Sequence, residues 1–272
     1  ALADVSMDID KIKRVLDKTG ACIAWGGAIN LAPADDIIIR VEHPLSVDPE
    51  GQLLASIMAK KGSVGATHLL IDIPVGRGAK LENKKEANHL KLEFERIGCA
   101  LGMKVCVVIS DGSQPIGKGI GPTLEARDLL WMLKNDPRQP YDLRKKSVFM
   151  AGLVFEMTGK ARKGQGEKMA EEILHSGKAY KKMWDIILAQ GAKIKSAEQL
   201  KPAKLCFDVP SPKSGKITHI NNKAISKIAR LAGCPETHSA GVYLYHHVGD
   251  KVKKGDALFT IYAQVQDKLN YA

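Results

Sequence analysis

The chain has 272 residues, of which 44% are hydrophobic and 26% are charged, and its formal net charge is +11. This composition is ordinary for a globular protein, and the length allows one or two domains with a sizeable core. The sequence has no run of about 18 apolar residues and no secretory signal pattern at its start. We therefore expect a cytoplasmic protein with no membrane partner.

The surplus of basic residues is compatible with two kinds of partner. Lys and Arg alternate with acidic residues, as in KLENKKEANHLKLEFER, and only 5% of residues are aromatic. Nucleic-acid sites usually gather basic residues on one face, often with stacking aromatics. The pattern therefore favours a site for anionic small molecules over a site for nucleic acid.

The five cysteines are widely scattered, and no pair has the C-x-x-C spacing of a metal or redox site. Cys22, Cys99 and Cys106 lie in apolar segments. We expect these three to be reduced residues of the core.

The first sixty residues are expected to alternate helices with apolar strands. Apolar residues at helical spacing predict a helix over 7–19. The segment GACIAWGGAINLAPADD (20–36) is interpreted as a strand leading into a glycine-rich loop, and DIIIRV (36–41) is strand-like. A further helix is expected over 50–62.

The next part of the chain has the pattern of a βαβ unit. Two continuous apolar runs, over 67–75 and 103–111, are typical of buried parallel strands. The amphipathic segment 84–101 between them is expected to form the crossover helix.

Each of these strands is followed by a glycine-rich loop, GRGAK (76–80) and GKGIG (117–121). Ligands bind at such strand ends in open α/β sheets. Neither loop has the P-loop or the G-x-G-x-x-G pattern, so each either approaches a phosphate or metal or simply makes a tight turn. Thr123 is a candidate N-cap for the helix that follows.

Two or three helices are expected over 141–190, and the texture of the sequence changes near residue 204. From there short strands alternate with charged turns around one helix, NKAISKIARLAG. The stretch VGDKVKKGDALFTI has the pattern of the hairpin in biotinyl and lipoyl carriers. It lacks the Met-Lys-Met turn of those carriers, so we expect no attached cofactor.

The predicted fold class is α/β, with a partial mixed or parallel sheet flanked by helices and a segment of a helical lobe. The C-terminal module is predicted to be α+β and hammerhead-like (barrel-sandwich). The expected domains are 1–63, a strand and helix segment with part of the helical lobe, 64–203, the sheet core, and 204–272, the C-terminal module.

Four stretches in this order, GGAINLAPADD, DPEGQLLASIMAKK, GATHLLIDIPVGRGAK and SDGSQPIGKGIGPTLEARD, resemble the thymidine/pyrimidine-nucleoside phosphorylase family. The resemblance covers nearly all of the chain, including its C-terminal module. Within the family, WGGAINLAPADD and DIPVGRGAK look most like the archaeal AMP phosphorylases. Since the family's phosphate-binding segment has no counterpart here, the resemblance implies the C-terminal part of such an enzyme.

The resemblance implies phosphorolysis of AMP to adenine and ribose 1,5-bisphosphate, with CMP and UMP as further substrates. Phosphate would be a co-substrate, and no cofactor is implied. A homo-oligomer is expected, and this chain alone is expected to be inactive. Thymidine or pyrimidine nucleoside phosphorolysis is the alternative activity. A non-catalytic dimerisation module or a nucleic-acid-binding module is the alternative from another class.

The resemblance also implies roles for particular residues. Asp48 aligns with the proton donor, Ser56 and Lys80 with nucleotide-binding positions, and Arg40 and Lys60 with base-binding positions of pyrimidine-specific relatives. Asp48 is equally well suited to cap the helix that follows, with proline at the first helical position.

Ser56 and Lys60 are four residues apart and are expected to share a helix face. The charges between Asp35 and Lys61 would then form the base- and nucleotide-facing wall of a cleft.

Ile116, Gly119 and Asp128 match positions that hold a monovalent cation in pyrimidine phosphorylases. The first two would contribute backbone carbonyls. The family usually has Glu where this chain has Asp128, and other ligands of that cation have no counterpart here. We therefore expect no metal, with these three residues as the weak candidates.

Overall fold

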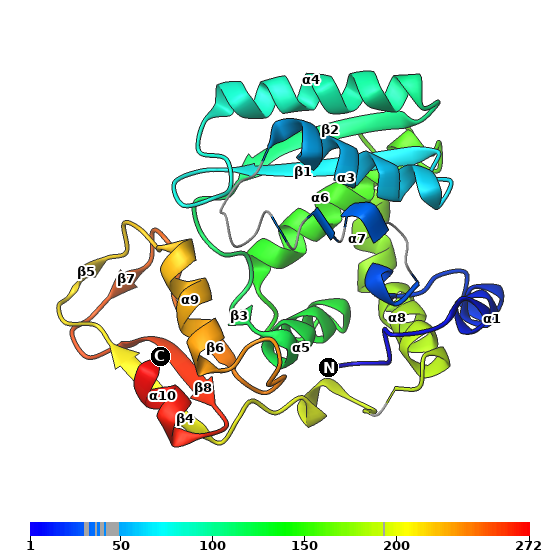
Figure 1. The fold of residues 1–272 in the computed structure, drawn as a ribbon. Helices are drawn as coiled ribbons and strands as arrows, with labels where there is room; N and C mark the ends of the chain where they lie inside the picture. The colour runs from blue at the N-terminus through cyan, green and yellow to red at the C-terminus, as the bar shows by residue number, and fades with distance from the viewer. Residues whose placement is uncertain (30–32, 36, 39–40, 42–48, 193) are drawn as a thin grey trace.

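The structure, a computed structural model, describes residues 1–272 except 30–32, 36, 39–40, 42–48 and 193. Its central unit is the predicted βαβ arrangement. Strands β1 (His68–Val75) and β2 (Lys104–Asp111) are parallel, and helix α4 (Lys84–Ala100) connects them. In Figure 1, α4 runs along one side of the strand pair and α6 (Tyr141–Met157) along the other.

The core of this unit is built from one face of β1 and from two helices. Alternate residues of β1, from Leu69 to Val75, are buried, and they pack with apolar residues of α4 and of α3 (Glu50–Ser63). In β2 Val107 is buried and the residues beside it are only partly buried, so the predicted burial of this second strand is confirmed in part. Among the described residues this sheet has two strands, and neither is enclosed by a neighbour on both edges.

The first sixty residues agree with the prediction at their two helices and differ between them, since α3 covers the helix expected over 50–62. Helix α1 (Ile9–Thr19) is present, with Asp8 as its N-cap. Residues 21–25 have no regular secondary structure, η1 (Gly26–Ile29) is a 3₁₀ helix, and Ile37, Ile38 and Val41 are helical, so both predicted strands are wrong for the described residues. These three side chains are exposed, and a short apolar run by itself does not distinguish strand from helix.

Four helices follow the βαβ unit. They are α5 (Pro122–Leu133), α6, α7 (Gly166–His175) and α8 (Lys178–Ala189), and a 3₁₀ turn η2 (Ala197–Gln199) comes after them. The N-cap of α5 is Gly121 and not the predicted Thr123. Pro122 takes the first helical position, and Thr123 is buried within the first turn.

The C-terminal module contains strands and two helices. The strands are β4 (Leu205–Pro210), β5 (Gly215–Lys216), β6 (Gly241–Leu244), β7 (Lys251–Val252) and β8 (Ala257–Ala263); the helices are α9 (Asn222–Ala232) and α10 (Gln266–Tyr271). Strand β7 pairs with β5, and β8 pairs with β4 and β6. The stretch VGDKVKKGDALFTI is therefore not a simple hairpin.

The module's main sheet also takes a strand from the glycine-rich loop. Its order is β3-β6-β8-β4, where β3 (Gly119–Ile120) lies between the βαβ unit and α5 in the chain. The structure is thus a mixed α/β fold with small sheets. The hammerhead-like detail and the division at residues 63 and 203 remain predictions, although β3 links the second and third predicted domains.

The cysteines are distributed differently from the prediction. Cys99 is exposed, Cys22 and Cys106 are partly buried, and Cys234 is buried. Cys99 lies near the end of α4, in an apolar stretch whose outer face is open to solvent. No helix in the described ranges is long and apolar enough to cross a membrane.

Candidate functional site

Ser56 and Lys60 lie on one face of α3 and meet at a single carboxylate. Ser56 Oγ donates to Asp35 Oδ2 over 2.8 Å, and Lys60 Nζ lies 2.5 Å from the same oxygen. Gln52, one turn earlier on α3, donates from Nε2 to Asp35 Oδ1 over 3.0 Å. The expected common face is therefore confirmed, and its partner within the chain is Asp35.

The Asp35 side chain is only 8% exposed. Burial favours the neutral carboxyl and raises its pKa, but hydrogen bonds from Lys60 and Ser56 and the Lys60 charge outweigh this, so the pKa of Asp35 is lowered. Asp35 is thus an ionised residue beneath α3 and not an exposed part of a wall.

Asp48 and Arg40 lie outside the described residues, so the structure does not place the predicted proton donor or one of the base-binding residues. It does place the start of the helix that Asp48 precedes. Pro49 takes the N-cap position of α3, and among the described residues no side chain caps that end. The predicted arrangement of Asp48 as N-cap with Pro49 inside the helix is shifted by one residue.

Lys80 lies on a different element, the loop after β1, where its side chain is exposed. Gly76 of this loop has a packing role. A Cβ at Gly76 would lie 2.6 Å from the backbone nitrogen of Ser113, in the loop after β2. The two loops after β1 and β2 therefore touch, and glycine at position 76 allows this close approach of backbone within the chain.

The strand ends carry a second group of charges that the sequence did not reveal. Lys146 of α6 forms an ion pair with Asp72 of β1 and donates to Ser110 Oγ of β2 over 3.0 Å. Asp111 ends β2, and its pKa is lowered because it accepts hydrogen bonds from Ser113. These groups lie toward the carboxyl ends of the strands, where open α/β sheets bind ligands.

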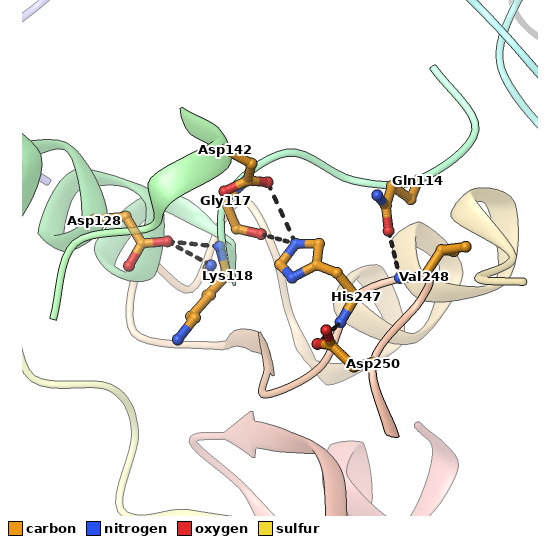
Figure 2. A network of polar contacts seen from close by, with 9 residues as sticks. Gln114, Gly117, Lys118, Asp128, Asp142, His247, Val248 and Asp250 are labelled. Carbon is orange, nitrogen blue, oxygen red and sulfur yellow. Dashed lines mark hydrogen bonds and ion pairs between the residues drawn. The ribbon is translucent and has the colours of Figure 1, made fainter. Parts of the chain in front are cut away.

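The second glycine-rich loop is held by the C-terminal module, as Figure 2 shows. His247 Nε2 lies 2.9 Å from the carbonyl oxygen of Gly117 and 3.4 Å from Asp142 Oδ2, and Asp142 also accepts from the Gly117 amide. The Val248 amide donates to Gln114 Oε1 over 2.7 Å. Part of this loop, β3, is therefore the edge strand of the module's main sheet, and the residues before it are hydrogen-bonded to the module.

Asp128 fixes the same loop from the side of α5. Its Oδ2 accepts from the amides of Lys118 and Gly119 over 2.9 and 2.7 Å, and Figure 2 shows both bonds. Burial raises the pKa of Asp128, although these two bonds oppose the rise. Its other oxygen, Oδ1, is buried and has no hydrogen-bond partner within the described part of the chain.

The three cation candidates are close to one another. Ile116, Gly119 and Asp128 line one cavity of about 650 Å³, together with apolar residues from the start of the chain. The orphaned Oδ1 fits a ligand of a monovalent cation, since carboxylate and carbonyl oxygens suit hard cations. Among the described residues there is no group of three or more His, Cys, Asp and Glu side chains that could hold a metal ion. This cavity is lined by other residues than Ser56 and Lys60.

Sequence reasoning missed Asp35 as a partner of α3, and it missed Gln52, Lys146 and His247. Only Gln52 has a usable signal, because it precedes Ser56 by four residues on the same helix face. The others come from distant segments that only the fold brings together.

The sequence of the chain is similar to those of several phosphorylases. Residues 216–272 match the pyrimidine nucleoside phosphorylase C-terminal domain. The whole chain is 47% identical to an AMP phosphorylase of Methanococcus aeolicus, and 99% of it aligns at 49% identity with an AMP phosphorylase of Thermococcus kodakarensis. It is also 45% identical over its full length to a Legionella pneumophila protein named "Putative thymidine phosphorylase".

The chain spans about half the length of these relatives, namely 54%, 54% and 52% of the three proteins. The family model that it matches describes a C-terminal domain. Both findings agree with the expectation that the chain corresponds to the later part of such proteins.

Proposed function

Because the chain belongs to the thymidine/pyrimidine-nucleoside phosphorylase family, we propose that it acts as part of a longer phosphorylase that transfers a pentose from a base to phosphate. The reaction proposed for it is AMP with phosphate giving adenine and ribose 1,5-bisphosphate, with CMP and UMP as further substrates. The observation that carries the proposal is the identity of 47–49% across the chain to proteins named AMP phosphorylase.

The reaction needs a general acid and a positioned phosphate nucleophile. Cleavage of the glycosidic bond leaves negative charge on the base and positive charge on the sugar, so an acid must protonate the base while an anionic phosphate attacks the sugar. In this proposal Asp48 is the acid, Arg40 and Lys60 bind the base, Ser56 contacts the nucleotide beside Lys60, and Lys80 binds the 5′-phosphate by charge-assisted hydrogen bonding. Phosphate is a co-substrate, and the proposed enzyme uses no organic cofactor and assembles as a homo-oligomer.

Phosphorolysis of thymidine or other pyrimidine nucleosides is the second candidate. The Legionella relative's name favours it, and the matched C-terminal domain is named after pyrimidine nucleoside phosphorylases. The two candidates differ in whether the substrate carries a 5′-phosphate.

The test is a chromatographic assay for released base. The complete product of the gene and the 272-residue chain are each incubated with phosphate and AMP, CMP, UMP, adenosine or thymidine. We expect the complete product to release base from AMP, and the 272-residue chain to release none, since loss of a positioned nucleophile can cost ~7–11 kcal/mol of barrier lowering. Release from thymidine but not from AMP would select the second candidate. No release from any substrate, together with binding in a gel shift, would favour a nucleic-acid module.

Asp48→Asn in the complete product tests the proposed acid. An amide cannot donate a proton as a carboxyl does, so kcat should fall on the order of 100-fold or more. The matched control is Glu50→Gln, which neutralises an exposed acid at the start of the same helix. The two variants should have similar melting temperatures. Near-normal turnover in Asp48→Asn would remove Asp48 from this role.

A further inference from the structure

Three side chains of α3 converge on Asp35 at intervals of one helical turn. Gln52 uses one carboxylate oxygen, and Ser56 and Lys60 share the other. Asp35 itself precedes α3 and is almost fully buried. Asp35 thus binds both Ser56, a proposed nucleotide contact, and Lys60, a proposed base contact, and it can control which hydrogen-bonding groups they present to a ligand.

The hydrogen atoms at this cluster can be counted. An ionised carboxylate only accepts hydrogen bonds, a serine hydroxyl has one hydrogen and two lone pairs, and a lysine ammonium has three hydrogens. The single hydrogen of Ser56 points to Asp35 Oδ2, so Ser56 can only accept from a ligand. Lys60 directs one hydrogen to the same oxygen and keeps two for other acceptors.

The charges can be added in the same way. Lys60 contributes one positive charge and Asp35 one negative charge at 2.5 Å, so the pair is formally neutral. A neutral pair attracts a phosphate far less than an uncompensated lysine would, because its field falls off much faster with distance. The α3 face therefore suits an uncharged group that presents both a donor and an acceptor.

We propose that Asp35 is a positioning residue that sets the specificity of this site, by holding Ser56 as an acceptor and Lys60 as a donor. The ligand class it selects is a nucleobase edge with an N–H donor beside a ring-nitrogen or carbonyl acceptor. The 6-amino group and neighbouring ring nitrogen of adenine have this pattern, as do N3–H and O4 of uracil. This inference rests on the proposed function, and it adds the residue that orients the site.

The first test needs no substrate. The complete gene product is treated with a trace of an amine-acylating reagent, and acylation at Lys60 and at its exposed neighbour Lys61 is followed by mass spectrometry. The variant is Asp35→Asn, with Glu50→Gln as the control that removes a different acid of the α3 region. An ammonium paired with a carboxylate is a poor nucleophile. Asp35→Asn should therefore raise the rate of acylation of Lys60 roughly tenfold, which is the factor that corresponds to the loss of one charge-assisted hydrogen bond. Lys61 should not change, and Glu50→Gln should change neither residue.

The second test measures base discrimination with the same variants. AMP is compared with purine riboside 5′-monophosphate, which lacks the 6-amino donor. Asp35→Asn frees the Ser56 hydroxyl, so KM for AMP should rise roughly tenfold and the preference for AMP over the analogue should shrink by a similar factor. kcat should change much less than KM, since Asp35 does not touch the reacting atoms. A Ser56→Ala background should abolish most of the effect on preference.

The two tests fail in different ways. Equal acylation of Lys60 in wild type and Asp35→Asn overturns the pairing, whatever the enzyme does. Unchanged KM and unchanged base preference in Asp35→Asn overturn the specificity role even if the pairing is real. If the wild-type protein cleaves no nucleotide or nucleoside, the proposed function and the ligand class both fall, while the acylation result still decides whether Asp35 holds Lys60.

Discussion

Asp128 provides the sharpest stability prediction, because one buried oxygen holds two consecutive backbone amides. Its side chain is only 2% exposed, and Oδ2 accepts from Lys118 and Gly119 at 2.9 and 2.7 Å. Asp128→Ala removes both bonds and leaves the Gly119 amide buried without an acceptor.

The magnitude follows from these two bonds. A hydrogen bond to a charged group contributes about 1.5–3 kcal/mol, so Asp128→Ala should cost about 3–6 kcal/mol locally. Asp128→Asn keeps a neutral acceptor of the same shape, and neutral bonds of about 0.5–1.5 kcal/mol would leave a cost of about 2–3 kcal/mol. The predicted order of stability is therefore wild type, Asn, Ala.

Hydrogen exchange of the two amides is the direct assay. Exchange at Lys118 and Gly119 should accelerate on the order of 10- to 100-fold in Asp128→Asn and by more in Asp128→Ala, since 1.4 kcal/mol corresponds to about a factor of ten. Asp142→Asn is the matched control, because Asp142 accepts from Gly117 in the same loop. It should accelerate Gly117 and leave Gly119 nearly unchanged. Unchanged exchange at Gly119 in Asp128→Ala would refute the reasoning.

Three further predictions follow from single features. If the orphaned Oδ1 of Asp128 holds a monovalent cation, the wild-type melting temperature should be higher in potassium chloride than in tetramethylammonium chloride at equal ionic strength. The variant Asp128→Asn should lose this difference. Equal melting temperatures of the wild type in the two salts would exclude the cation. Lys80→Ala should weaken AMP by roughly 10- to 100-fold in KM but leave adenosine nearly unchanged, and equal losses would place Lys80 elsewhere on the substrate. Burial raises the pKa of the Cys234 thiol to about 11, so near-neutral alkylation should modify the exposed Cys99 before Cys234, and equal rates at these two residues, measured by mass spectrometry, would contradict this.

The sequence predicts the regular elements of this protein well where their periodicity is long. Helices α1, α4 and α9 and the parallel pair of β1 and β2 follow from apolar spacing over many residues. The failures at 20–36 and 36–41 come from short apolar runs, whose length is compatible with strand or helix. Exposure of Ile37 and Val41 shows that apolar character there does not report burial in a sheet.

The candidate site could be predicted only along one helix. The four-residue spacing of Ser56 and Lys60 is local, and it correctly places both on one face of α3. Their acceptor, Asp35, precedes Ser56 by 21 residues and reaches α3 through a segment whose predicted strands are wrong. No periodicity in the sequence connects the two, so the partner becomes visible only in three dimensions.

The second glycine-rich loop is another place where the sequence does not reveal a contact with a distant segment. Its glycines predicted either a phosphate or metal contact or a tight turn, but a Cβ at Gly121 would lie 2.5 Å from the carbonyl oxygen of Ala240, and Gly119 and Ile120 pair with β6. The glycines are there because another backbone approaches. A glycine-rich loop at a strand end therefore indicates close approach, and the sequence does not say whether the approaching group is a ligand or a distant part of the same chain.

The contact between Asp35 and Lys60 shows that the positive net charge of the chain is not available at every lysine. The net charge of +11 suggests a site for anions, yet Lys60, which lies in the proposed base site, is neutralised by Asp35. An uncompensated lysine at that position would draw the 5′-phosphate into the base site and favour inverted binding. Lys80, the proposed phosphate ligand, lies on another loop, so in this proposal the base and the 5′-phosphate of a nucleotide are held by different elements. Asp35 would then orient the substrate as well as select its base, and Asp35→Asn should weaken AMP more than it weakens adenosine, which has no phosphate to misplace.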